Sequence, residues 1–218
     1  MKSKIGISLV CLLALAFACA TVPAFADPAW SVEGVVYDNT GPGSNTTNAW
    51  SVFDIGGGAY AVTDSFTLSY ITTVQDANFN IWVLPDDSLT SVNWAIMSTV
   101  DGTPIASGTA AGGPNTQVAT AFSYYPVLQE SIAIPNVVLQ PGTYYIQLSE
   151  GQDAYDNNVW WDESDGASTA YETGGIGAIP SETFQIVGTP TPEPSSFLLL
   201  GSAMLTLAGL AVRRKLTA

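Results

Sequence analysis

Residues 27–192 contain no lysine, arginine, histidine or cysteine. Both cysteines lie within the first 26 residues, so the body of the protein can form neither a disulfide nor a thiolate metal site. Without histidine, lysine or cysteine, the body also cannot assemble a Ser-His-Asp triad, a Schiff base or a thiol nucleophile. Carboxylate chemistry is the only common type of side-chain catalysis left, and we expect a protein that is not an enzyme.

The missing basic residues leave the body strongly acidic. Its 18 Asp and Glu residues, the 19 of the whole chain minus Glu193, have no cationic side chain to offset them. Affinity for phosphate groups comes mainly from lysine and arginine. The composition therefore excludes a nucleic-acid-binding role and disfavours contact with anionic lipid headgroups.

Residues 1–26 have the pattern of a secretory signal peptide. Two lysines precede an apolar run, and small residues then mark a cleavage site at Ala24, Ala26 and Asp27. This pattern predicts recognition by the secretion machinery, removal by signal peptidase and a mature chain that begins at Asp27. A lipid-acceptor role for Cys19 is the less favoured alternative, because lipidation would require a cut before Cys19 and the bulky Phe17 lies close to that position.

Residues 27–188 predict a single all-β domain. Short β-branched and aromatic runs alternate with clusters of Gly, Pro, Asn and Asp, which favour turns. Within residues 143–149, Tyr144, Ile146 and Leu148 alternate with polar positions, as expected for a strand with one buried face. We expect an antiparallel β-sandwich, jelly-roll-like in topology, with strands within residues 30–38, 65–74, 78–84, 92–100, 117–125, 131–139, 143–149 and 182–187.

The C-terminal part of the chain has three segments in a fixed order. Residues 189–196 form a proline-rich tether, residues 197–212 are uncharged and predict one short transmembrane helix, and residues 213–218 form a basic cytoplasmic tail. Sixteen residues of helix span about 24 Å, which is short against a hydrocarbon core of about 30 Å. A plain single-pass anchor is one interpretation of this order.

A more specific interpretation comes from the residues that flank the apolar segment. The order of motif, helix and basic stop resembles the PEP-CTERM sorting signal of Gram-negative bacteria, on the residues Pro192, Glu193, Pro194, Arg213, Arg214 and Lys215. The resemblance implies processing by an exosortase at the inner membrane, followed by delivery to the outer envelope or extracellular matrix. The tail also resembles the C-terminus of ice-binding proteins, although the body has no regular Thr-x-Thr array.

The body is similar to a group of exported β-sandwich domains that end in the same signal and have no assigned activity. This weaker resemblance rests on residues 94–96 with 103–108, 141–145, 159–164 and 179–184. It implies a fold and gives no function.

Residues 150–172 hold the densest group of acidic residues in the chain. A solvated acidic loop is the simplest interpretation. The alternatives are a calcium site, for which carboxylates and loop carbonyls provide hard oxygen ligands, and a glycosidase-type carboxylate pair. The candidate calcium ligands are Asp153, Asp156, Asp162 and Asp165.

Aromatic residues adjoin this acidic region and suggest contact with sugars. The candidates are Trp160, Trp161, Tyr155 and Tyr171, whose flat faces could cover the C–H side of a sugar ring. Neighbouring side chains on a strand point to opposite faces, so we expect one of the two tryptophans in the core.

The sequence as a whole predicts a non-enzymatic envelope or matrix protein associated with extracellular polysaccharide, as in a biofilm. A carbohydrate-binding module, with or without bound calcium, is the alternative, and a carboxylate glycosidase is the least favoured interpretation.

Overall fold

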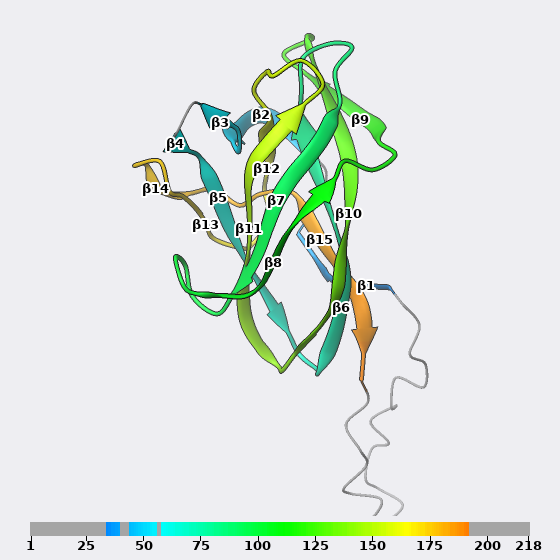
Figure 1. Cartoon of the computed structure of the whole chain (residues 1–218), viewed down its shortest axis with the longest axis vertical. Helices are drawn as coiled ribbons and strands as arrows, with labels where there is room; N and C mark the ends of the chain where they lie inside the picture. The colour runs from blue at the N-terminus through cyan, green and yellow to red at the C-terminus, as the bar shows by residue number, and fades with distance from the viewer. Residues whose placement is uncertain (1–33, 40–43, 56–57, 192–218) are drawn as a thin grey trace, which may run out of the picture. The chain divides into compact units, whose positions relative to one another are not determined.

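The computed structural model describes residues 34–39, 44–55 and 58–191. These residues form two antiparallel β-sheets and a small hairpin (Figure 1), which confirms the all-β prediction. The predicted jelly-roll order of the strands stays a prediction. The signal peptide, its cleavage residues, the Pro-Glu-Pro motif, the C-terminal helix and the basic tail lie outside the described residues. Among the described residues, no helix is long and apolar enough to cross a membrane.

The first sheet contains seven strands. Its main path runs through β1 (Gly34–Asp38), β15 (Phe184–Pro190), β6 (Thr72–Trp82), β10 (Tyr125–Leu139) and β9 (Thr116–Ala121). Two further strands, β12 (Trp160–Ser164) and β2 (Ser44–Ser51), extend one end of it. Strand β6 is shared: β15 pairs with its residues from Thr72 to Phe79, and β12 pairs with Ile81 and Trp82. This junction places Trp160 beside Trp82.

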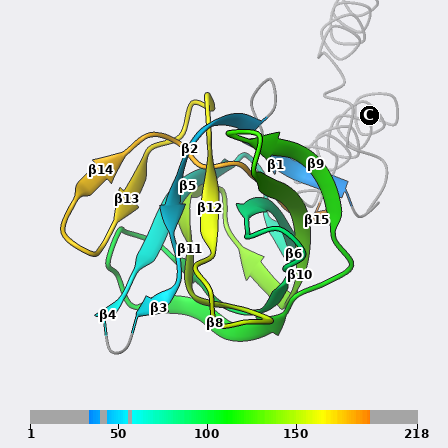
Figure 2. The same cartoon turned by 90° about the horizontal axis from the view of Figure 1, so that it is seen from above.

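The second sheet contains six strands. Its order is β14 (Gly177–Ile179), β13 (Ala170–Glu172), β5 (Ala61–Leu68), β11 (Gly142–Asp153), β7 (Leu89–Met97) and β8 (Pro104–Ala111). The hairpin consists of β3 (Asp54–Ile55) and β4 (Gly58–Ala59). Seen from above, β5 and β11 lie on one side of the core and β6, β10 and β15 on the other (Figure 2).

The core fills the space between the two sheets and contains residues from both. On β11, Ile146 and Leu148 are buried, which confirms the predicted alternation. Trp161 on β12 is fully buried, and its ring meets Phe79 and Phe184 edge-on at centroid distances of 6.4 and 5.9 Å. Large apolar side chains stabilise such a domain by about 25 cal/mol per Å² of apolar surface buried.

Two predicted runs were wrong in their boundaries. Residues 117–125 contain the turn between β9 and β10 at residues 122–124. Residues 65–74 contain the reversal between β5 and β6, because Ser69, Tyr70 and Ile71 leave the strand conformation. The sequence prediction also lacked β2, β3, β4, β8, β12, β13 and β14. Strand β8 is rich in alanine and glycine and lies at a sheet edge, so its sequence carries little β signal.

Candidate functional site

A cluster of aromatic side chains lies on the first sheet, at the end where β6, β12 and the β9–β10 turn meet. We call it the aromatic patch, and its members are Trp82, Phe122, Tyr124, Tyr125 and Trp160. Phe122 and Tyr124 are 66% and 56% exposed, whereas Trp82 is only 5% exposed. The patch therefore presents aromatic rings to solvent above a buried tryptophan.

The rings of the aromatic patch hold one another in place. Tyr125 stacks on Trp82 with centroids 6.2 Å apart and planes 24° apart, and it meets Trp160 edge-on at 5.7 Å. Phe122 meets Trp82 edge-on at 5.6 Å, and Tyr124 meets Tyr125 in the same way at 4.9 Å. Such ring pairs favour defined orientations, so this surface is organised before any ligand arrives.

The β9–β10 turn displays these rings through an unfavourable backbone conformation. The Tyr124 N–H donates to the Ala121 carbonyl over 2.9 Å, and the two central residues, Phe122 and Ser123, have φ angles of 49° and 57°. A turn with two positive φ values strongly favours Asn-Gly. A phenylalanine in the left-handed region costs about 1–2 kcal/mol. Strain of this kind is common at binding and catalytic sites.

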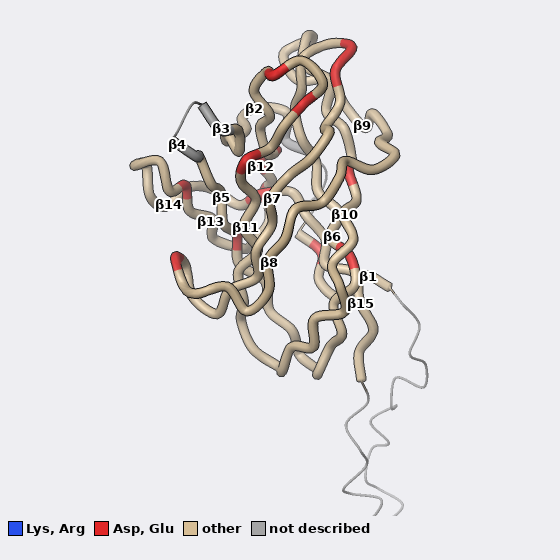
Figure 3. Tube along the Cα trace, viewed as in Figure 1, with Lys and Arg blue, Asp and Glu red and all other residues tan. Residues whose placement is uncertain are grey.

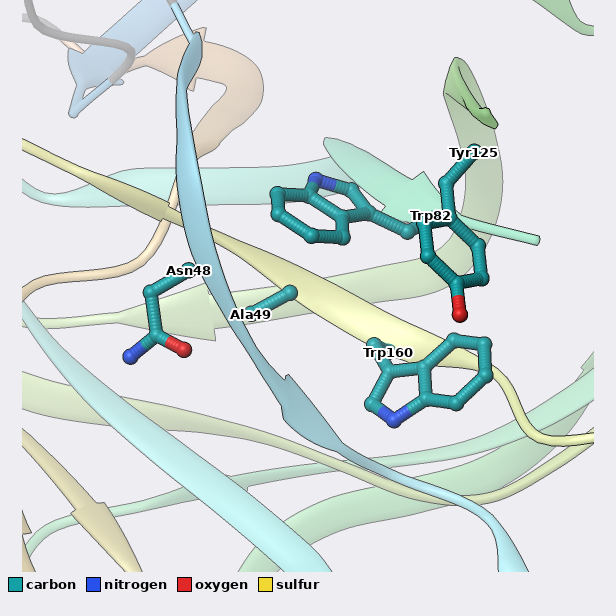
Figure 4. A pocket seen from close by; sticks show the side chains of 5 residues that line it. All are labelled: Asn48, Ala49, Trp82, Tyr125 and Trp160. Carbon is teal, nitrogen blue, oxygen red and sulfur yellow. The ribbon is translucent and has the colours of Figure 1, made fainter. Parts of the chain in front are cut away.

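A shallow pocket of about 210 Å³ opens between these rings and β2. Trp82, Tyr125 and Trp160 line it together with Asn48 and Ala49. Figure 4 shows the Tyr125 ring extending toward Trp160, with Asn48 across the pocket. The Asn48 amide donates to the Glu163 carboxylate over 2.9 Å, which fixes its orientation. The lining offers aromatic faces and one amide, and it contains no carboxylate.

The structure separates the four aromatic residues that the sequence nominated for sugar contact. Trp160 is half-buried and belongs to the aromatic patch. Trp161 points into the core, and its indole N–H donates to the Thr183 carbonyl. Tyr155 is exposed on the turn after β11, and Tyr171 lines a separate hollow of about 490 Å³ next to β13.

The four candidate calcium ligands have different surroundings and do not form one site. Asp162 is fully buried, where Trp82 and Thr183 donate to its carboxylate. Asp153 is buried at the end of β11, while Asp156 and Asp165 are exposed. Within the described ranges, no group of three or more acidic side chains is arranged to hold one metal ion.

Several carboxyl groups are buried without any cation nearby, and Figure 3 shows acidic but no basic positions along the described trace. Glu130 and Glu182 are 1% and 0% exposed, and none of their four carboxyl oxygens accepts a hydrogen bond. Asp64 is also fully buried, but it accepts from the Ser168 hydroxyl and from the backbone N–H groups of Ser65 and Glu182.

Burial controls the protonation of these three groups. It raises the pKa of Glu130 to about 7, an effect that the nearby Asn115 amide and Gly113 N–H only partly oppose. It raises the pKa of Asp64 to about 6 against the hydrogen bonds that lower it. The pKa of Glu182 lies well above its ordinary value through burial and repulsion from Asp64.

Sequence reasoning missed most of the aromatic patch. Trp82 was interpreted as a packing residue, and Phe122, Tyr124 and Tyr125 all lay within the strand predicted at residues 117–125. One signal was available: Phe122-Ser123-Tyr124-Tyr125 places three aromatic residues where β9 and β10 must reverse, although turns favour Gly, Asn and Asp. Two of these side chains, Phe122 and Tyr124, are exposed to solvent.

Comparison with known proteins identifies the C-terminal part of the chain. Residues 190–215 match the PEP-CTERM protein-sorting motif. No curated protein matches the chain. The motif implies export, recognition by an exosortase and membrane-associated processing in a Gram-negative bacterium. The chain thus carries a PEP-CTERM sorting signal that follows directly on the last strand of a two-sheet β domain.

Proposed function

We propose that the body is a non-enzymatic, polysaccharide-binding domain that its sorting signal delivers to the outer envelope or extracellular matrix. The observation that supports it best is the aromatic patch, in which exposed Phe122 and Tyr124 stand on a strained turn beside half-buried Trp160. Aromatic faces cover the apolar C–H side of a sugar ring, and the Asn48 amide is placed to contact hydroxyl groups.

The charge of the body favours a neutral polysaccharide. Residues 27–192 hold 18 acidic residues, the 19 of the chain minus Glu193, and no basic residue. A uronate or sulfated chain would meet repulsion with no cationic side chain to offset it. Neutral hexose polymers avoid this cost, and stacking on rings does not require a charged partner.

The composition of the pocket supports binding rather than turnover. A glycosidase needs two carboxyl groups about 5 to 9.5 Å apart on either side of the scissile bond. The residues that line the pocket are Asn48, Ala49, Trp82, Tyr125 and Trp160, none of which is acidic. Glu163, the acid bonded to Asn48, also accepts from the Trp50 indole N–H over 3.2 Å.

The proposal is tested by titrating the full-length protein with soluble neutral glucans, mannans and galactans in a calorimeter. Removing one ring face takes away roughly 50 Å² of apolar contact, or about 1.3 kcal/mol, so Tyr124→Ala should weaken binding about tenfold. Trp160→Ala should weaken it at least as much. The matched control is Tyr70→Ala, since Tyr70 is 51% exposed at the β5–β6 turn, away from the aromatic patch.

Two results would overturn the proposal. One is the absence of binding to any neutral or acidic glycan. The other is hydrolysis of a bound glycan that a single Asp or Glu substitution abolishes, which would make the domain a carboxylate glycosidase. Trp161→Ala is unsuitable for this test because it opens a cavity in the core.

A further inference from the structure

We propose that Asp87 and Asp153 form a binding site for a hard divalent cation, with calcium the best match. The site lies where the loop after β6, residues 83–88, meets the turn after β11, residues 154–159. It uses Asp153 from the predicted calcium ligands, and it adds Asp87, which lies 66 positions earlier in the chain and which sequence reasoning did not consider. The inference does not depend on glycan binding.

Backbone N–H groups hold one oxygen of each carboxylate. The Oδ1 atom of Asp153 accepts from the N–H groups of Tyr155 and Asn157 over 3.0 and 2.7 Å. The Oδ1 atom of Asp87 accepts from those of Ser88 and Ala154 over 2.8 and 3.1 Å. Four N–H donors therefore fix both carboxylates before any ion binds, and the second oxygen of Asp153 is left without a donor.

The second oxygen of Asp153 is the feature that points to a ligand. Asp153 is only 5% exposed, and its Oδ2 atom is buried and accepts no hydrogen bond from the described residues. The Asp87 carboxylate lies next to it, within hydrogen-bonding reach of the Asp153 carboxyl group. Two carboxylates this close repel each other unless they share a proton or a cation lies between them.

No side chain of the body can supply that positive charge, because residues 27–192 have no lysine, arginine or histidine. A cation from the medium can. Carboxylate oxygens are hard ligands that suit calcium, which takes six to eight oxygens. The site has two carboxylates rather than the three of a stronger cluster, in agreement with the absence of larger acidic groups among the described residues.

The remaining ligands would come from water, backbone carbonyls and the Asn157 amide. At present the Asn157 Nδ2 atom donates to Asp87 Oδ2 over 3.0 Å. A 180° rotation of the Asn157 side-chain amide would turn its oxygen atom, instead of its nitrogen atom, toward the site. With only two charged ligands, the affinity should match that of extracellular calcium modules, with a Kd of about 10⁻⁴ to 10⁻³ M.

The test is thermal unfolding of the full-length protein, stripped with a chelator, with and without 10 mM calcium chloride. Binding at this affinity should raise the Tm by about 3 to 10 °C. Asp153→Asn should abolish the rise while folding normally, because its amide oxygen can still accept from Tyr155 and Asn157 and its NH₂ group can donate to Asp87. Without calcium, this variant should be at least as stable as the wild type.

Terbium luminescence excited through tyrosine is the second measurement, since Tyr155 adjoins the site. Terbium should give a saturable signal that calcium displaces and that Asp87→Asn removes. The matched control is Asp165→Asn, an exposed predicted ligand outside the site, which should keep both responses. The proposal is refuted if calcium leaves the wild-type Tm unchanged, or if Asp153→Asn responds to calcium as the wild type does.

Discussion

Glu130 should make this domain lose stability as the pH rises from 5 to 8, and Glu130→Gln should remove part of that loss. In the folded chain the Glu130 pKa is raised from 4.5 to about 7, so the folded state holds the proton more tightly than the unfolded state. The resulting stability is fully present below pH 4.5. It is lost as the pH rises through about 7, where the buried carboxyl must ionise.

The size of this loss of stability follows from the pKa shift of Glu130. A rise of about 2.5 units at 1.36 kcal/mol per unit corresponds to about 3.4 kcal/mol between the two limits. The Gly113 N–H and the Asn115 amide, both from the β8–β9 loop, favour the ionised carboxylate and offset part of this cost. We therefore expect Glu130→Gln to be more stable than the wild type by about 2 kcal/mol at pH 8, and to differ much less at pH 5.

Urea unfolding of both proteins at pH 5, 6, 7 and 8 measures this difference directly. Any cost of burying the glutamine amide is the same at every pH and cancels from the change with pH. Glu150→Gln is the control, because it makes the same chemical change at an exposed position. The reasoning would be refuted if the difference in free energy of unfolding between Glu130→Gln and the wild type stayed constant from pH 5 to 8.

Two further predictions concern the turn and the tail. Replacing Phe122-Ser123 by Asn-Gly should stabilise the domain by about 1 kcal/mol, seen as a Tm about 2 to 4 °C higher, because it removes the strain of two positive φ angles. The same change should weaken glycan binding, so a tighter complex would contradict the role of Phe122. Intact mass of the protein from membrane, surface and medium fractions of its host should show a chain that begins at Asp27 and ends near residue 192. A C-terminus retained in the membrane fraction would instead indicate a permanent anchor.

The fold class could be predicted because it depends on local patterns. Alternation along residues 143–149 and the turn cluster before it located most of β11, which spans Gly142–Asp153. Strand boundaries failed where the sequence changes little at a turn, as at Tyr70 between β5 and β6. The pairing of the strands could not be predicted either. For example, the pairing of β12 with the end of β6 depends on contacts between residues about 80 positions apart.

The site was harder to predict for the same reason. The alternation rule correctly placed one of two adjacent tryptophans in the core, and burial identifies it as Trp161. The partners of Trp160 come from three other strands, β2, β6 and β10, so no local motif contains them. The acidic region was recognised, yet its carboxylates separate into the buried Asp162, the paired Asp153 and the exposed Asp165.

The pairing of β15 also has a mechanical consequence. Strand β15 ends at Pro190, opposite Thr72 at the start of β6, and the sorting motif begins at that same residue. Trp82, in the aromatic patch, lies at the other end of β6, about 33 Å away at 3.3 Å per residue. A pull between a surface-attached tail and a ligand on the aromatic patch would therefore run along the strands. The ladders from β15 to β1 and β6 would be loaded in shear, with many hydrogen bonds resisting together instead of opening one by one.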